Sequence, residues 1–386
     1  MRLSLGLLVV GSVVLAACSG QDGIGGVQRG SGSGSDERGG TPGTTPGAVT
    51  PAAVSCPATV SAATAISTSE TNATDVCLLL GGDVVYRDAQ KVYRAKAKAA
   101  RAEVYTSPDL LHAFADDSVL VTIESPNPPD AILKVMPVAG TITPVPQPPS
   151  DTKGGIGTAG ALSVTPAGWS AGGTHVFASD ATSLYILADV TNVGDTIYQV
   201  NKANPNQMTV LAQLQATLSD PQLAGTDVWF VRDQKRVYKV AITAVADPLL
   251  EKGAGVASPP VEVFGLGYAD CKLAVGGMHA FCSTGTALEQ RDLSGANLLT
   301  VLDSQKGATP SVLGAAVYGN DTVFVRTLPS SATDLLKNGI RTVKTGGAAP
   351  EDKLLACGRE AITAIAVDAT SVVWAEKGKG VFSAPR

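Results

Sequence analysis

Charged and aromatic residues are scarce in this chain of 386 residues. Charged residues make up 16% and aromatic residues 5%, and 29 Lys and Arg against 34 Asp and Glu leave a formal net charge of −5. Nucleic-acid binding depends on localised Lys and Arg side chains that neutralise phosphates. A mildly acidic chain without such localisation therefore argues against a nucleic-acid partner.

The sequence also has few motifs that carry catalysis. The three histidines, His112, His175 and His279, stand in neither a His-x-x-x-His nor a His-Glu-x-x-His arrangement, and no Cys-x-x-Cys pair occurs. We predict no serine nucleophile of the Gly-x-Ser-x-Gly type in the folded part of the chain. No catalytic residue, metal ligand or cofactor is assigned, and the prediction leans away from an enzyme. Binding of a divalent cation such as calcium is compatible with the sequence, but no motif supports it. His112 and His175 lie just before predicted strands. A position that faces a central channel is compatible with both.

The N-terminus carries the strongest localisation motif. A short positive start, Met1-Arg2, is followed by an apolar run over residues 3–14 and then by Leu-Ala-Ala-Cys ending at Cys18. The run is too short to span about 30 Å of hydrocarbon, so it is typical of a cleaved signal peptide. Leu-Ala-Ala-Cys resembles the lipobox of bacterial lipoproteins. That resemblance implies a signal peptide over 1–17 and lipid on Cys18. Ser19, in place of Asp, favours the outer membrane of a Gram-negative cell.

Residues 18–55 are predicted to form a disordered tether. The stretch is rich in Gly, Ser, Pro and Thr and poor in apolar side chains, so it cannot offset the entropy lost on ordering. It would hold a folded domain, residues 56–386, away from the membrane. Plentiful Gly and Pro, with 42 and 23 residues, indicate a turn-rich all-β domain.

A repeat runs through this domain. Each copy is a turn of small polar residues followed by a short β-branched and aromatic strand, and residues 179–186 share Asp-Ala-Thr-Ser with residues 367–374. Seven such strands begin at Val84, Val119, Leu184, Val228, Met278, Val323 and Val372. The last five recur every 44 to 50 residues, which is the length of a propeller blade.

A second alternating strand follows most copies, as at 91–95, 196–200 and 380–384. The sequence therefore predicts a β-propeller, most simply with seven blades, although six or eight are compatible with the weaker first copies. The last copy ends without an outer strand, so residues 58–66 are predicted to supply it and close the ring. The pattern resembles irregular bacterial propellers of the YWTD and NHL-like groups. That family includes binding modules, lactonases and lyases, so the fold leaves the function open.

The remaining cysteines fit an oxidising compartment. Cys271 and Cys282 flank two neighbouring predicted strands and are expected to form a disulfide. The pairing of Cys56, Cys77 and Cys357 is left open.

Carboxylates recur in the predicted turns. Because a catalytic group is normally needed once and not in every blade, we interpret them as residues that cap their own turns. They are Asp117, Asp180, Asp227, Asp321 and Asp368.

Three functions are compatible with these features. The first is a membrane-anchored scaffold that binds a protein or glycan. The second is a metal-dependent enzyme of the lactonase or lyase type. The third is an accessory subunit of an outer-membrane assembly. The absence of catalytic motifs and the presence of the predicted tether favour the first function.

Overall fold

The protein is described by a computed structural model. It describes residues 18–19 and 63–386, apart from 71, 80, 97–99, 139–161, 165, 167, 215, 244–259, 267–270, 277–278, 284–286, 304–310, 319–321, 329–338, 345–350, 360–361 and 369. The predicted signal peptide and residues 20–55 of the predicted tether lie outside the described residues.

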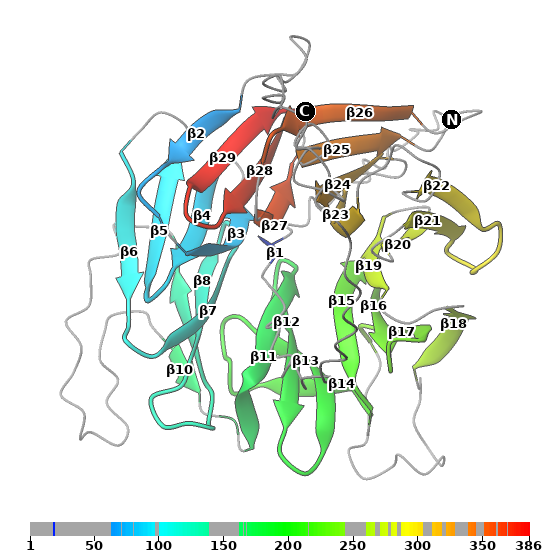
Figure 1. Cartoon of the computed structure of the whole chain (residues 1–386). Coiled ribbons are helices and arrows are strands. Elements are labelled where there is room, and N and C mark those ends of the chain that lie inside the picture. The colour runs from blue at the N-terminus through cyan, green and yellow to red at the C-terminus, as the bar shows by residue number, and fades with distance from the viewer. Residues whose placement is uncertain are drawn as a thin grey trace, which may run out of the picture.

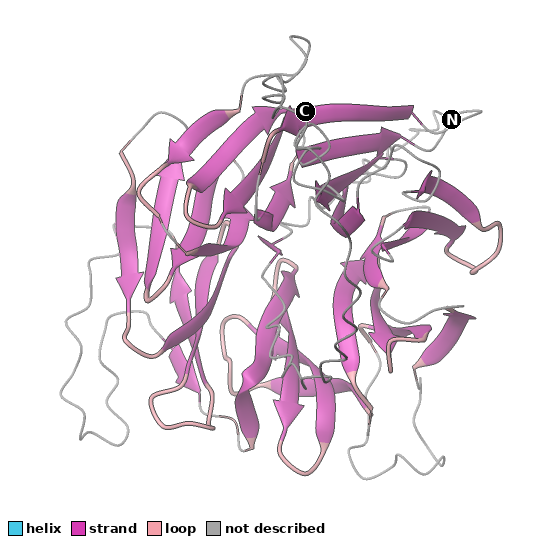
Figure 2. Ribbon diagram, in the orientation of Figure 1, coloured by secondary structure: helices cyan, strands magenta, loops and turns pink. Residues whose placement is uncertain are grey.

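The described strands form seven antiparallel sheets arranged in a ring (Figures 1 and 2). Each sheet is a blade, and the innermost strand of each blade contacts the innermost strand of the next. The inner strands are β3 (Ala73–Leu78), β7 (Leu110–Ala115), β11 (Trp169–Ser179), β15 (Leu218–Ala224), β19 (Lys272–Val275), β23 (Ser311–Tyr318) and β27 (Ile362–Val367). We number blades 1 to 7 in this order.

Three further strands complete each blade outward. The second strands are β4 (Asp83–Asp88), β8 (Val119–Glu124), β12 (Ser183–Val190), β16 (Asp227–Arg232), β20 (His279–Ser283), β24 (Thr322–Leu328) and β28 (Ser371–Glu376). The third strands are β5 (Lys91–Lys96), β9 (Ile132–Pro137), β13 (Gly194–Asn201), β17 (Arg236–Ala241), β21 (Ala287–Asp292), β25 (Gly339–Lys344) and β29 (Gly380–Pro385). The outer strands are β6 (Ala102–Thr106), β10 (Leu162–Val164), β14 (Met208–Gln213), β18 (Val261–Gly265), β22 (Leu299–Asp303), β26 (Glu351–Cys357) and β2 (Thr64–Ser67).

The predicted fold class is confirmed. Six of the seven predicted strand starts fall within the second strand of a blade; the seventh, Met278, lies outside the described residues, directly before β20. The alternating strands that follow coincide with third strands. β-Branched and aromatic side chains suit these strands because both faces of a blade pack against neighbouring blades. Among the described residues, no helix is long and apolar enough to cross a membrane.

The closing strand is found as β2, Thr64–Ser67, which overlaps the end of the predicted stretch 58–66; residues 58–62 lie outside the described residues. β2 pairs antiparallel with β29, with Thr64 opposite Ser383 and Ala65 opposite Phe382, so one blade combines strands from both ends of the domain. Gly380 faces this strand at a φ of +113°, and a Cβ there would lie 2.1 Å from the carbonyl oxygen of Ser67. The absence of a side chain at Gly380 is therefore what lets β2 dock.

A buried carboxylate fastens the closing strand to the first blade. Glu70, between β2 and β3, is 1% exposed. It accepts hydrogen bonds from the hydroxyls of Ser67 and Tyr86, each at 2.6 Å, and pairs with the guanidinium of Arg101. The Arg101 guanidinium also lies 4.2 Å from the centre of the Tyr93 ring. Because these partners come from the end of β2 and from blade 1, Glu70 joins the last blade to the first.

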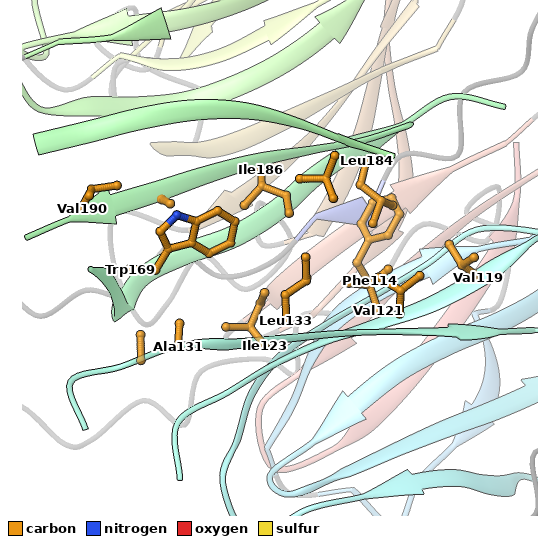
Figure 3. Packing of buried hydrophobic residues seen from close by; sticks show 14 residues of the cluster. Phe114, Val119, Val121, Ile123, Ala131, Leu133, Trp169, Leu184, Ile186 and Val190 are labelled. Atoms are coloured by element: carbon orange, nitrogen blue, oxygen red, sulfur yellow. The ribbon is translucent and has the colours of Figure 1, made fainter. Parts of the chain in front are cut away.

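The core lies between blades. Around Trp169, side chains of blade 2 such as Ile123 and Leu133 pack against Ile186 and Leu184 of blade 3 (Figure 3). All three tryptophans are about 2% exposed or less, and each lies in or faces such a layer. Removal of one blade would therefore expose apolar side chains on two others.

Substitution of Glu70 by Gln should weaken ring closure. The amide keeps the shape but loses the charge that holds Arg101, so we expect the free energy of unfolding to fall by about 1–3 kcal/mol. Glu103→Gln is the matched control, because Glu103 makes an exposed 2.7 Å pair with Lys91 and should lose at most about 1 kcal/mol. Denaturant unfolding measures both variants. Equal losses would contradict the closing role of Glu70.

Candidate functional site

Two of the predicted turn residues cap their turns. The Asp180 carboxylate accepts the backbone N–H groups of Thr182 and Ser183, both at 2.8 Å. The Asp368 carboxylate accepts those of Thr370 and Ser371 at 2.7 and 2.8 Å. In both turns the acceptor stands three residues before the first residue of the second strand. This use of the carboxylate is structural.

In blade 2 the capping residue differs from the prediction by one position. Asp116, and not Asp117, accepts the N–H groups of Ser118 and Val119, at 2.8 and 2.9 Å. The reason is register: β8 begins at Val119, which places Asp116 three residues earlier, whereas Asp117 is two residues earlier and exposed.

Asp227 also differs from the prediction. It is the first residue of β16 and not a turn residue, and its carboxylate lies 3.2 Å from the ammonium group of Lys239 on the neighbouring strand β17. Asp321 lies outside the described residues.

Asp116 also links two blades. Its Oδ2 accepts the hydroxyl of Ser179 at 2.6 Å and the ammonium group of Lys202 at 2.5 Å, and both residues belong to blade 3. Burial alone would raise the pKa of Asp116, but the hydrogen bonds from Lys202, Ser179 and Ser118 outweigh it and hold the pKa below its usual value. This ionised carboxylate is a strut between blades 2 and 3.

The other end of the channel, where the inner strands begin, gathers the more unusual residues. Most inner strands carry a bulge near their first residues, and bulges re-aim side chains. Asp75 and Asp220 occupy equivalent bulges in β3 and β15, with positive φ angles of 49° and 50°. The channel-mouth residues, as we call them, are Asp75, His112, His175, Asp220 and Lys272.

Asp75 is the buried base of this group, with 4% of its side chain exposed. Its Oδ2 lies 2.5 Å from Nε of Arg87 and accepts the backbone N–H of Ala113 in blade 2 at 3.2 Å. Its Oδ1 lies 3.7 Å from Nδ1 of His112. Burial alone would raise the pKa of Asp75, but His112 and Arg87 outweigh burial and keep the pKa below its usual value.

The two histidines lie side by side. The ring centres of His112 in β7 and His175 in β11 are 6.2 Å apart. His112 is part of His-Ala-Phe-Ala and His175 of His-Val-Phe-Ala, and each is the first residue after the bulge of its strand. The shared pattern, His-x-Phe-Ala, is the sequence feature that could have predicted their contact. His279 is on the second strand of blade 5, and its Nε2 lies 3.8 Å from Asp292.

Asp220 and Lys272 form a second ion pair, between the inner strands of blades 4 and 5. The ammonium group of Lys272, the first residue of β19, lies 3.5 Å from Oδ1 of Asp220. Like Asp75, Asp220 reaches from its own blade to the next inner strand. In the bulge of blade 7, Thr363 does the same through a 2.8 Å hydrogen bond to the carbonyl of Ala73. The bulges thus join neighbouring inner strands and also place polar groups at the channel.

One motif was overlooked in the sequence. Residues 168–172 read Gly-Trp-Ser-Ala-Gly, which matches the Gly-x-Ser-x-Gly pattern. A nucleophile elbow needs a sharp turn from a strand into a helix, whereas Ser170 lies within β11 and pairs with Asp189 of β12. Among the described residues, no histidine hydrogen-bonds to Ser170. The local structure therefore does not support a serine nucleophile.

The cysteines are largely accounted for. Cys271 and Cys282 form a disulfide between β19 and β20, as expected. Cys77 and Cys357 are each disulfide-bonded, and Cys56 lies outside the described residues. Cys18 and Ser19 form the two-residue strand β1, which pairs with β3 so that Cys18 is opposite Cys77. Within the described part of the chain, no three His, Cys, Asp or Glu side chains gather to hold a metal ion.

Comparison with known proteins supports the fold assignment and does not identify a function. No known protein family and no curated protein matches the sequence. Solved structures do match. The WD40 β-propeller domain of Doa1 aligns with a TM-score of 0.51 at 10% identity, over 85% of this chain and 96% of that one. The fold is a β-propeller.

Two further structures align with similar scores. YCF48 from Cyanidioschyzon merolae has a TM-score of 0.50 at 9% identity, over 85% of this chain and 98% of its own. The extracellular domain of the putative one-component system BT4673 from B. thetaiotaomicron has 0.51 at 9%, over 84% of this chain and 40% of its own. Such low identity defines the architecture alone.

Asp116 should contribute stability that acid removes. Because its pKa is lower in the folded chain than in the unfolded chain, its contribution is present at neutral pH and is lost as the pH falls below about 5. Asp116→Asn should lower the free energy of unfolding at pH 7 by about 1–3 kcal/mol and reduce its acid dependence. Asp117→Asn is the control, with an expected change within about 0.5 kcal/mol. Unfolding curves at several pH values measure this, and a larger effect at Asp117 would contradict the register.

Proposed function

We propose that this chain is an exported, lipid-anchored β-propeller that acts as a binding module without catalysis, and that its ligand binds at the channel mouth. The observation that carries the proposal is the convergence of Asp75, His112 and His175 from three consecutive inner strands.

Backbone conformation supports the same location. Asp75 and Asp220 adopt left-handed conformations inside strands, which cost free energy for residues other than glycine, although Asp tolerates them better than most. Such residues cluster at binding sites because the surrounding structure must impose them. Here they orient two buried carboxylates beneath histidine and lysine side chains. The mouth is therefore a preorganised polar surface on a rigid ring.

The lipid anchor rests on the Leu-Ala-Ala-Cys motif. A flexible chain of the length of residues 18–55 has an average end-to-end distance of about 35 Å, enough to separate the ring from a bilayer. Acyl chains on Cys18 require that β1 leave β3, because β1 lies inside the ring beside β3, β11 and β27. Membrane anchoring would thereby clear the channel. The outer membrane is the proposed location because Ser19 follows the cysteine.

Mass spectrometry of the N-terminal peptide from the membrane fraction tests the anchor. We expect a diacylglyceryl thioether on Cys18, and we expect Cys18→Ala to release the chain into the soluble fraction, since several acyl chains bind far more strongly than one. A peptide that joins Cys18 to Cys77 by a disulfide would contradict lipidation at this residue.

Photo-crosslinking in intact cells tests the binding surface. Gly172, in the bulge of β11, and Gly265, at the end of β18, are both exposed, and an added Cβ meets no atom within 4 Å at either position. A photoreactive residue at Gly172 should give a discrete adduct, because the ligand would lie at the mouth, while the same residue at Gly265 should give none. No adduct at Gly172, or equal adducts at both, would refute the proposed surface.

A further inference from the structure

We infer that Cys357 forms a disulfide with Cys56, and that this bond closes the ring covalently by joining the outer rim of blade 6 to the chain that leads into β2. The pairing follows from the positions of the described cysteines, from the partners that these positions exclude, and from the reach of the chain before Ala63. Cys56 itself lies outside the described residues, and Ala63 is the seventh residue after it.

Cys357 has three possible partners. It is the last residue of β26, the outer strand of blade 6, and it is 6% exposed and disulfide-bonded. The chain has six cysteines, of which Cys271 and Cys282 are bonded to each other. The partners that remain are Cys18, Cys56 and Cys77.

Cys77 lies in a different part of the ring. It belongs to the apolar layer between blades 1 and 2, with Leu120 and Met136, and its sulfur accepts the backbone N–H of Ala115 in blade 2 at 3.3 Å. The sheet of blade 1 and the whole of blade 7 stand between that layer and β26 (Figure 1). Because a disulfide needs Cα atoms about 4.4–6.8 Å apart, Cys77 is excluded as the partner of Cys357.

Cys18 lies beside the same inner strand as Cys77. The β1–β3 pairing places Cys18 opposite Cys77, and β1 also contacts β11 and β27, which are inner strands of blades 3 and 7. β26 is separated from the channel by β23, β24 and β25. Cys18 is therefore excluded on position alone, whether or not it carries lipid. Cys56 is the partner that remains for Cys357.

The chain before β2 is long enough to reach Cys357. Ala63 packs against the apolar layer that includes Leu355 and Ala356, the two residues before Cys357. The seven residues from Cys56 to Ala63 span up to about 25 Å when extended. A six-residue strand of this layer, such as β29, is about 20 Å long. The segment can therefore reach either end of β26.

Formation of the bond needs an oxidant. The two thiols of Cys56 and Cys357 give up two protons and two electrons to the disulfide of a thiol–disulfide oxidoreductase. The transfer passes through a mixed disulfide with one of the two cysteines, and the oxidoreductase leaves as a dithiol. Such oxidants act outside the cytosol, so this step rests on the export that is part of the proposed function.

The bond would protect the seam of the ring. β2 has four residues and pairs with β29 at three positions, so backbone pairing alone holds it weakly. With Cys56 bonded to blade 6, a detached β2 stays close to β29, which raises its effective concentration there. Cys56 also directly follows the predicted tether, residues 18–55. A pull on the tether would therefore be carried to blade 6 and not to β2.

Peptide mapping tests the pairing directly. The full chain is extracted from the membrane, alkylated, and digested without reduction. We expect one linked pair of peptides that contains Cys56 and Cys357 and separates on reduction. Linkage of Cys357 to Cys77 or Cys18, or recovery of Cys357 as an alkylated thiol, would overturn the inference. Because the unsubstituted chain is mapped, this result does not depend on the folding of a variant.

Hydrogen exchange tests the protective role. Cys56→Ser, Cys357→Ser and the double variant should each raise the amide exchange rates of β2 and β29 about tenfold or more, and to the same extent, because each removes the same bond. Exchange in β12 and β13 of blade 3 should not change. Unchanged exchange in β2 and β29, or a double variant with the summed effect of both single variants, would overturn the role.

A disulfide elsewhere in the ring provides the matched control. Cys271→Ser with Cys282→Ser removes the bond between β19 and β20, which links residues only 11 positions apart in blade 5. This variant should leave the exchange of β2 and β29 unchanged. Faster exchange there would show that loss of any disulfide loosens the seam, and would overturn the specific role of Cys357.

The outcomes also separate this inference from the proposed function. A Cys56–Cys357 bond found together with a peptide that joins Cys18 to Cys77 would keep the covalent closure and reject the lipid anchor. Lipid on Cys18 found together with a Cys77–Cys357 bond would keep the anchor and reject the closure.

Discussion

Pairing between β2 and β29 is the contact on which the rest of the molecule depends. Blades bury their apolar faces only against neighbours, and a ring gives every blade two neighbours only when its ends meet. The ends meet through a few backbone hydrogen bonds and the buried Glu70 cluster. Glycine at position 380 is part of the same constraint, since any side chain there would collide with the closing strand. Closure of the ring therefore depends on the β2–β29 pairing, the Glu70 cluster and the absence of a side chain at Gly380.

The sequence predicted the parts of the fold that repeat. Turn residues followed by β-branched and aromatic strands mark the second strands, because polar turns and half-buried strands select different residues. The inner strands were harder to predict. Their bulges interrupt the alternation of polar and apolar residues, and in β11 four residues before His175 stand opposite a single residue of β12. A bulge has no fixed composition, so periodicity alone does not reveal it.

The candidate site was only partly predictable for the same reason. Placement of His112 and His175 at the channel was open from the sequence, while their contact depends on equivalent positions after two bulges. Asp75 and Asp220 have no sequence pattern that separates them from ordinary turn acids. The one-residue difference between Asp116 and Asp117 shows that strand register determines which aspartate caps the turn. The cap requires an acceptor three residues before the strand, and Asp117 stands only two residues before it.

The two ends of the inner strands use carboxylates differently. At the end where β7 and β11 finish, Asp116 is saturated by backbone, hydroxyl and ammonium donors, so nothing remains to offer a ligand. At the mouth, Asp75 is also satisfied, but its partner His112 stays partly exposed and adjoins a second histidine. A saturated carboxylate stabilises the ring, and the same carboxylate with an exposed partner also orients that partner. The bulges make this second use available, because they place the buried acid of one inner strand against the partly exposed histidine of the next.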